Sequence, residues 1–272
     1  MSPVAATPRA RRQPPPFRLV TVERVEHLSP RLVRVTLAGP ALDGLTVEEP
    51  AASVRLLLPS PGSDHLVVPD WNGNEFLLPD GSRPVIRTFT PRRVDPVHHQ
   101  LELEIVNHGP GMASEWAVSA SAGTRQQAAV SGPGRGYTID PDAPAFVLAG
   151  DETAIPAISQ LLEFIPARVA VLVHIEVAHP EARVALAEHR RATVQWWDLP
   201  PGAPVGDALL SAIEGSELVP GVRVWVAGEA AAVQRIRRHL FESRGLSRAQ
   251  ATVRGYWKHG RSGEADALTE GR

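Results

Sequence analysis

The stretch Arg87-Thr88-Phe89-Thr90-Pro91-Arg92 (RTFTPR) decides how the rest of the chain is interpreted. Its β-branched and aromatic residues are typical of a strand end. Alternate side chains of a strand share a face, which places Arg87 and Phe89 together. A guanidinium can bind a phosphate as a fork, an aromatic ring can lie against an isoalloxazine, and the Thr90 hydroxyl or N–H can reach the flavin N5 edge. The stretch therefore fits a flavin, although a strand edge with a surface arginine explains the same residues.

The composition limits the chemistry that the chain can perform. Of its 272 residues 43% are hydrophobic and 21% charged, and the net charge of -2 gives no argument for binding nucleic acid or an anionic membrane surface. The absence of cysteine excludes disulfides, iron–sulfur clusters and Cys-ligated zinc. Redox chemistry would need an organic cofactor, since the histidines make no convincing metal site: His98 and His99 are adjacent and would point to opposite faces of a strand.

The compartment follows from what the sequence does not contain. No apolar run approaches the roughly 18–20 residues of a membrane-spanning helix. Residues 1–16 carry three arginines with no apolar stretch after them, which is not the pattern of a signal peptide. We expect a disordered leader over 1–16 and a cytoplasmic protein with no membrane partner, present as a monomer.

The N-terminal half alternates apolar and polar residues with a period of two, as strands do. About six short antiparallel strands separated by turns predict a small β-barrel. The segments concerned are 17–27, 31–38, 53–58, a short strand near 76–78, the RTFTPR stretch, 101–108 and 127–131.

From residue 145 onward, continuous apolar strands alternate with helical patterns, which predicts a doubly wound, mostly parallel sheet. The expected strands are 145–150, 168–177, 193–199, 222–228 and 251–257, with helices after 153 and at 181–190, 206–213 and 230–243. We therefore expect a barrel domain over 17–140, an α/β domain over 145–260 and a flexible tail over 261–272.

Four glycine-containing turns are candidate ligand sites. The segment 108–117 predicts a strand end, a glycine turn and a helix from Ala113 whose first N–H groups suit a pyrophosphate, although an ordinary strand–turn–helix joint is the commoner meaning. Trp116 is assigned to the core. The glycines of 132–136 favour a tight exit from the barrel. The turns at 150–156 and 228–229 follow parallel strands, where nucleotides bind in such sheets, but neither matches GxGxxG.

Taken in order, these stretches resemble one family. The chain is similar to siderophore-interacting proteins, flavin-dependent ferric-siderophore reductases of the ferredoxin–NADP reductase-like superfamily, over residues 17–260. The residues that carry the resemblance are RTFTPR (87–92), HG with GMASEWA (108–117), GPGRG (132–136), GDETAIPAI (150–158), VAGEAAAVQRIRRHL (226–240) and RGYWKHG (254–260).

The resemblance implies an antiparallel six-stranded FAD-binding barrel followed by a doubly wound parallel-sheet domain that binds NADH or NADPH. Phe89 and Thr90 would carry the chemistry beside the flavin. Phe89 replaces the family's usual tyrosine, and Met112 its proline. The implied FAD contacts are Arg87, Thr88, Phe89, Thr90, His108, Gly109, Gly111, Met112, Ala113 and Ser114.

On the nicotinamide side, the resemblance implicates Asp151, Glu152, Thr153, Gly228 and Glu229. The aromatic pair Tyr256 and Trp257 would border the flavin. A ferric siderophore is often anionic, so cations should flank the site. Because Lys258 is the only lysine, arginines must share this task, and Arg55 and Arg254 are the candidates.

The implied reaction passes a hydride from NAD(P)H to the flavin and then single electrons to chelated Fe(III), releasing Fe(II). Two alternatives stay open. One is a general NAD(P)H:flavin or quinone oxidoreductase. The other is a non-redox flavin-holding protein of a natural-product pathway, which the departures at Phe89 and Met112 keep in play. A 2′-phosphate could be held by Arg183, Arg190 and Arg191, although a solvated helix face is the favoured interpretation of these arginines.

Overall fold

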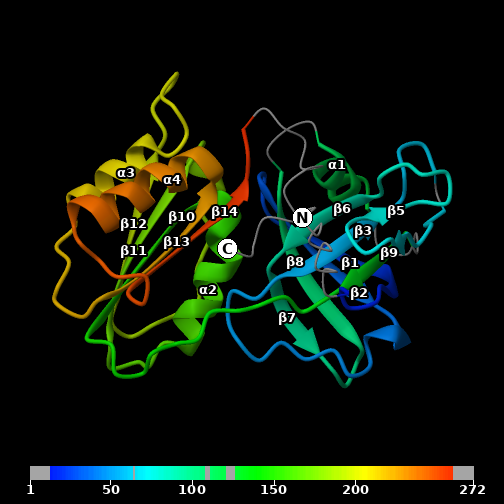
Figure 1. The fold of residues 1–272 in the computed structure, drawn as a ribbon, viewed down its shortest axis with the longest axis horizontal. Helices are drawn as coiled ribbons and strands as arrows, with labels where there is room; N and C mark the ends of the chain where they lie inside the picture. The colour runs from blue at the N-terminus through cyan, green and yellow to red at the C-terminus, as the bar shows by residue number, and fades with distance from the viewer. Residues whose placement is uncertain (1–12, 64, 108–110, 121–125, 260–272) are drawn as a thin grey trace, which may run out of the picture.

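The computed structural model of the chain describes residues 13–63, 65–107, 111–120 and 126–259. Two β-sheets lie side by side in it (Figure 1). A seven-stranded antiparallel sheet forms what we call the barrel half, up to Ser131, and a five-stranded parallel sheet forms the sheet half, from Ala145 onward. The prediction of an antiparallel barrel followed by a parallel α/β sheet is confirmed.

The antiparallel sheet has one strand more than expected because RTFTPR is divided between two strands. They are β6 (Val85–Phe89) and β7 (Pro91–Asp95), which form opposite edges of the order β6-β3-β9-β1-β2-β8-β7. Only Thr90 separates them, so the sheet must curl until its two edges meet at this residue. The remaining strands are β1 (Arg18–Ser29), β2 (Leu32–Ala38), β3 (Val54–Leu58), β8 (Gln100–Val106) and β9 (Gln127–Ser131).

The predicted alternation fills the barrel with aliphatic side chains. Inward residues of neighbouring strands are almost completely buried, among them Val35, Leu37, Leu56, Leu101 and Leu103. The helix α1 (Met112–Ser119) packs over β8 and β2 and buries Trp116 in this core, as predicted. The expected short strand near 76–78 is β5 (Phe76–Leu77), which pairs only with β4 (Asp70–Trp71).

The parallel sheet has the order β12-β11-β10-β13-β14. From β10, its first strand in the sequence, the chain adds β11 and β12 on one side and then β13 and β14 on the other. Helix α2 (Ile155–Phe164) covers the face turned toward the barrel, and α3 (Asp207–Glu214) and α4 (Ala230–Arg238) cover the other (Figure 1). A π-helical turn, His239–Ser243, continues α4. The strands are β10 (Ala145–Asp151), β11 (Ala170–Val177), β12 (Ala192–Asp198), β13 (Arg223–Glu229) and β14 (Ala251–Trp257).

The prediction of a helix over 181–190 is wrong. A single 3₁₀ turn, Pro180–Ala182, follows β11, and the chain then runs without regular structure to β12. Val184 and Leu186 pack against the core from this irregular segment. Tertiary packing therefore overrides the helix propensity of its alanines and leucine.

The ends of the chain lie largely outside the described residues. These exclude 1–12 of the expected leader and the whole tail from 260. The leader's last part is attached to the barrel, since the Ser131 hydroxyl donates to the Pro15 carbonyl at 2.5 Å. Across the described residues, no helix is long and apolar enough to cross a membrane.

Candidate functional site

The RTFTPR stretch lies where the barrel closes. In the β3–β6 pairing, Val54 stands opposite Phe89 and Leu56 opposite Arg87, so Arg87 and Phe89 share a face as alternation predicts. Thr88 is exposed on the other face. Thr90 is only 7% exposed, because it occupies the junction between the two edge strands.

Phe89 is the last residue of β6. Its half-buried ring packs against the barrel core, as do Met112 and Ala113 of the first helical turn. Arg87 is half-buried on the same face of β6 and donates one hydrogen bond to the Ile86 carbonyl at 2.9 Å. A guanidinium and an aromatic ring thus share one face of β6, and the start of α1 packs against the same barrel core.

Helix α1 begins without a side-chain cap, because its N-cap residue is Gly111. The Ser114 hydroxyl points inward, is buried and donates to the Val106 carbonyl at 3.2 Å. The first N–H groups of a helix have no partner within the helix, so backbone groups rather than the Ser114 side chain suit an anion here. His108 and Gly109, which the sequence assigned to the same site, lie outside the described residues.

A second set of predicted residues lies at the carboxyl edge of the parallel sheet and is centred on Asp151. This buried carboxylate accepts hydrogen bonds from the Thr153 N–H and hydroxyl at 2.9 and 2.5 Å, from the Glu229 N–H at 2.8 Å and from the Trp257 indole at 2.7 Å. Burial raises the pKa of Asp151, and these hydrogen bonds oppose the rise. Asp151 therefore ties the ends of β10, β13 and β14 together.

The two glutamates of this edge are also engaged within the protein. Glu152 binds the Arg31 guanidinium at 2.9 Å and the Ala178 N–H at 2.7 Å, one with each oxygen. Glu229 caps α4 through the Ala232 N–H and accepts from the His259 N–H. A Cβ at Gly228 would stand 2.6 Å from an Asp151 oxygen, so a larger residue there would disrupt the cluster.

The aromatic pair at the end of β14 is divided between two environments. Tyr256 packs edge-on against buried Trp225, with ring centroids 6.3 Å apart. Trp257 stays at the sheet edge, held by Asp151 and lying edge-on to His259 at 6.2 Å. Of the two, Trp257 is the residue in position to border a ligand at this edge.

The three predicted substrate cations differ in their surroundings. Arg254 donates to the carbonyls of Ala51 at 3.0 Å, Gly136 at 2.8 Å and Arg135 at 3.4 Å, and so joins β14 to the barrel half. Arg55 is half-buried on β3 opposite Thr88, and Lys258 is exposed. Within the described part of the chain, neither Arg55 nor Lys258 forms an ion pair. Because Arg55 pairs with Thr88, it lies on the face of β3 and β6 opposite to Arg87 and Phe89.

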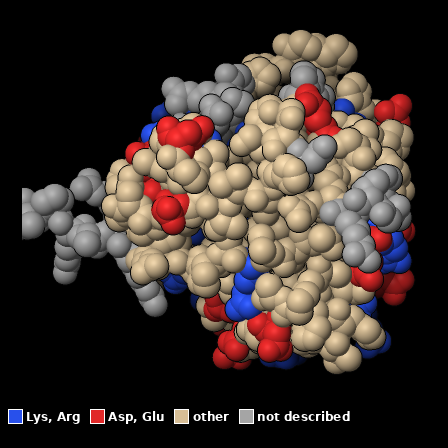
Figure 2. All heavy atoms as spheres, turned by 90° about the vertical axis from the view of Figure 1, so that its right-hand side faces the viewer, with Lys and Arg blue, Asp and Glu red and all other residues tan. Residues whose placement is uncertain are grey.

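Charged groups elsewhere are mixed in sign. On the face of the barrel turned away from the parallel sheet, the visible described surface is mostly uncharged, with basic and acidic side chains close to one another (Figure 2). Arg183 binds both carboxylate oxygens of Asp198 at 2.6 Å, at the carboxyl edge of the sheet. Arg190 and Arg191 precede β12 and so lie at the opposite edge, far from where a nucleotide binds such a sheet.

The glycines of 132–136 serve the exit from the barrel, as predicted. Gly134 donates to the Ser53 carbonyl at 2.6 Å, and a Cβ at Gly134 or Gly136 would overlap residues 49–53. The described residues contain no group of three or more histidines or carboxylates placed to hold a metal ion.

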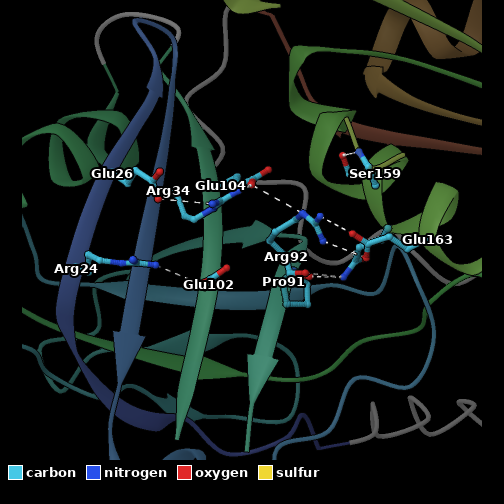
Figure 3. A network of polar contacts seen from close by, with 11 residues as sticks. Arg24, Glu26, Arg34, Pro91, Arg92, Glu102, Glu104, Ser159 and Glu163 are labelled. Carbon is cyan, nitrogen blue, oxygen red and sulfur yellow. Dashed lines mark hydrogen bonds and ion pairs between the residues drawn. The ribbon is translucent and has the colours of Figure 1, made fainter. Parts of the chain in front are cut away.

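Sequence reasoning missed the residues that join the two sets. The side chain of Gln160, in α2, binds backbone groups of the barrel at Ala51 and Pro91. Glu163, one turn later, forms an ion pair with Arg92 at 2.6 Å (Figure 3). No local sequence pattern marks Gln160, which lies outside the apolar stripe of its helix, or identifies its partners. Helix α2, which begins at the carboxyl edge of the sheet, is thus bonded to the closure of the barrel.

Two family models match the chain over most of its length. Residues 21–137 match the siderophore-interacting FAD-binding domain, and residues 143–260 match the siderophore-interacting protein. The crystal structure of a siderophore utilization protein from T. fusca has 35% identity and a TM-score of 0.80, covering 92% of this chain and 95% of that one.

Two curated relatives carry functional names. The NADPH-dependent ferric-chelate reductase of Escherichia coli is 30% identical, over 89% of this chain and 92% of that protein. The ferric vibriobactin reductase ViuB of Vibrio cholerae is 29% identical, over 91% of this chain and 92% of that protein.

Proposed function

Because the chain belongs to the siderophore-interacting protein family, we propose that it reduces iron(III) held by a siderophore. It is a flavin oxidoreductase that holds FAD and uses NAD(P)H. The proposal adds the substrate class and the order of electron transfer. Two electrons enter together from the nucleotide and leave singly to the chelated iron.

The barrel residues fit the parts of FAD. The Arg87 guanidinium and the uncapped start of α1 suit the phosphates, and the Phe89 ring, on the face that carries Arg87, suits the isoalloxazine. Met112 stands where the family usually has proline. It brings a backbone N–H that proline would lack, so this departure adds a donor at the helix start.

When bound, FAD supplies the conversion between two-electron and one-electron transfer. Phe89 would cover one face of the ring, and the buried Thr90 hydroxyl would offer a hydrogen bond to its polar edge. Asp151 would act indirectly: it fixes Trp257 at the border between the flavin and the nucleotide.

The cation proposed for the substrate is Lys258, which forms no ion pair with another described residue and is exposed after Trp257. Arg55 is not proposed, because it pairs with Thr88 on the face of β3 and β6 opposite to Arg87 and Phe89. Arg254 is excluded from this proposal because three carbonyl groups already engage its guanidinium. Fe(II) binds hard oxygen ligands less tightly than Fe(III), so reduction releases the iron.

The observation that carries the proposal is the meeting of the two predicted sets of residues. Helix α2 begins at the carboxyl edge of the parallel sheet, where nucleotides bind, and its residues Gln160 and Glu163 are bonded to the corner that follows Phe89 and Thr90. Electron transfer from a nucleotide to a flavin requires such closeness.

The test is an anaerobic titration of the purified protein followed by its absorption spectrum. We expect a yellow protein that bleaches with NADH or NADPH and recovers its colour with a ferric siderophore. Absence of bleaching with both nucleotides would overturn the proposal. Equal recovery rates with free flavins, dyes and ferric siderophores would instead favour a general flavin reductase, and tight FAD with no nucleotide binding would favour the non-redox alternative.

A further inference from the structure

Gln160 is a buried amide whose polar atoms all serve the other half of the molecule. It lies in α2 of the sheet half and is 7% exposed. Its Oε1 accepts from the Ala51 N–H at 2.9 Å. Its Nε2 donates to the Pro91 carbonyl at 2.5 Å and, more weakly, to the Arg92 carbonyl at 3.4 Å. One side chain thus binds two separate segments of the barrel.

These two segments flank a single cross-strand pair. Ala51 precedes Val54 by three residues, Pro91 follows Phe89 by two, and Val54 pairs with Phe89 across β3 and β6. The amide of Gln160 therefore bridges the two chains at the end of the pair that holds the flavin-facing ring. Displacing Gln160 would release both chains at this position.

The backbone at Ala51 shows how firmly this corner is held. Ala51 has a φ of 53°, a left-handed conformation that residues other than glycine rarely adopt. Such a conformation persists when its surroundings fix it. Gln160 binds the Ala51 N–H and Arg254 binds its carbonyl, so both polar groups are held by side chains of the sheet half.

Helix α2 connects this corner to the nucleotide edge. It begins at Ile155, directly after the Asp151–Ala154 turn, and its 10 residues span about 15 Å. Glu163 in its last turn binds Arg92, which also lies 3.9 Å from Glu104 of the barrel (Figure 3). Because a short helix is rigid, a position fixed at Gln160 and Glu163 also fixes the turn at its start.

We propose that Gln160 is a positioning residue for electron transfer from the nucleotide. It holds Phe89 and Thr90 in place relative to the Asp151–Ala154 turn. This inference rests on the proposed function, in which the nicotinamide C4–H bond breaks, both electrons and the hydrogen pass to flavin N5, and the nicotinamide is oxidised as the flavin is reduced. A displacement of about 1 Å can slow such a step about a hundredfold.

The inference separates the two halves of the catalytic cycle. Reduction by the nucleotide depends on the junction between the halves of the molecule. Reoxidation by a ferric chelate uses the flavin held in the barrel and needs no bound nucleotide. A residue that only stabilised the fold would affect FAD binding or both half-reactions together.

The test uses Gln160→Glu, which keeps an acceptor for the Ala51 N–H but turns a carboxylate oxygen toward the Pro91 and Arg92 carbonyls. Gln195→Glu, on the exposed side of β12, is the matched control for the added charge. Bleaching is followed by anaerobic stopped flow at saturating NADPH and NADH. Reoxidation is followed separately, with enzyme reduced by dithionite and mixed with ferric citrate.

We expect Gln160→Glu to bleach at least about tenfold more slowly, with FAD content and the reoxidation rate unchanged. The control should match the wild type in both steps. Equal slowing of both half-reactions, or no slowing of either in a protein that retains its FAD, would overturn the inference.

If Gln160→Glu does not fold or does not retain FAD, the variant Glu163→Gln tests the inference in its place. It removes only the partly exposed ion pair with Arg92. A smaller slowing of bleaching alone supports the positioning role, and no slowing contradicts it. A wild-type protein that does not bleach with either nucleotide contradicts the proposed function itself, so the two failures are distinguishable.

Discussion

The two sets of polar residues that meet at the junction of the barrel and the sheet use their polar atoms in opposite ways. On the barrel side, α1 follows a glycine at its N-cap position, and among the described residues no side chain caps its first N–H groups. At the sheet edge, Asp151, Glu152 and Glu229 each bind groups of the protein with both oxygens. One side offers donors to a ligand, while the other holds its charges within the fold.

The difference follows from the charge of the ligands. FAD and NAD(P)H both carry phosphates, and an exposed carboxylate beside either would repel it. Hydrogen bonds from inside the protein keep the three carboxylates turned away from the surface. The acidic residues of the sheet edge therefore hold that edge together, and we propose that backbone N–H groups and the Trp257 ring contact the nucleotide.

The sharpest test of this contrast is Asp151→Ala. It leaves the Trp257 indole and the backbone N–H groups of Thr153 and Glu229 without their acceptor. We expect a loss of about 3 kcal/mol or more in the free energy of unfolding, measured by urea denaturation. The variant should still bind FAD, but the nucleotide should no longer bleach the flavin.

The matched control is Asp142→Ala, which removes an exposed aspartate close to the start of the same sheet. Its effect should stay within about 0.5 kcal/mol. If Asp151→Ala left the unfolding free energy unchanged and weakened only nucleotide binding, Asp151 would be a direct ligand contact and the contrast would fail.

The corresponding change on the barrel side is Arg87→Gln. Loss of a charged hydrogen-bond donor to a phosphate costs about 1.5–3 kcal/mol, so FAD should bind about 10- to 100-fold more weakly. Arg87→Lys keeps the charge but loses the forked geometry of the guanidinium, so its FAD affinity should lie between those of the wild type and Arg87→Gln. FAD affinity is measured by fluorescence titration of the FAD-free protein, and its denaturation midpoint is measured in parallel to separate loss of affinity from loss of stability.

Arg83→Gln is the control for this experiment, because Arg83 lies four residues earlier and pairs with Glu75 at the surface. It should retain wild-type FAD affinity. If Arg87→Gln destabilised the FAD-free protein and left FAD affinity unchanged, Arg87 would have a structural role, like the carboxylates of the sheet edge.

The sequence predicted the fold better than it predicted contacts. Period-two alternation and continuous apolar runs located the strands, because burial of one or both strand faces imposes these patterns directly. The division of RTFTPR between β6 and β7 was missed. Its signal was Pro91, since proline is found at strand starts and edges, and Pro91 is the first residue of an edge strand.

Contacts depend on where distant elements meet, and local patterns do not contain that information. Residue type and spacing place Asp151 and Glu152 at the nucleotide edge. They do not reveal that Trp257 and Arg31 bind these carboxylates. Gln160 binds partners 69 and 109 residues away along the chain, so its role required the packed structure.

A smaller effect concerns another inward-directed polar group of the sheet half, His174. The Trp197 indole donates to its Nδ1 at 3.1 Å, so Nε2 carries the hydrogen and donates to the Ser216 hydroxyl at 2.9 Å. Burial lowers the pKa of His174 below its ordinary value of 6.5. The unfolded chain thus binds a proton more readily than the native protein, and stability falls as the pH drops through about 6.5.

Replacing His174 should change the slope of the unfolding free energy against pH by no more than about 1.4 kcal/mol per pH unit, the limit for one proton. Thermal denaturation between pH 7.5 and 5.5 should show a shallower dependence in His174→Gln than in the wild type. His65→Gln, which removes an exposed histidine, should keep the wild-type slope. Identical slopes in all three proteins would mean that His174 does not carry this dependence.

The smallest predicted effect concerns an exposed charged pair at the sheet edge, Arg183 with Asp198. Doubly wound sheets bind a 2′-phosphate with an arginine after the second strand. Arg183 has that position but is neutralised by Asp198. Asp198→Asn would release it, so KM for NADPH should fall about threefold while KM for NADH stays constant, as expected for an exposed pair. Glu188→Gln, an equal change of charge in the preceding loop, should alter neither. Equal changes in KM for NADPH and NADH in Asp198→Asn would show that this pair, like the carboxylates beside it, stabilises the sheet edge and does not select the nucleotide.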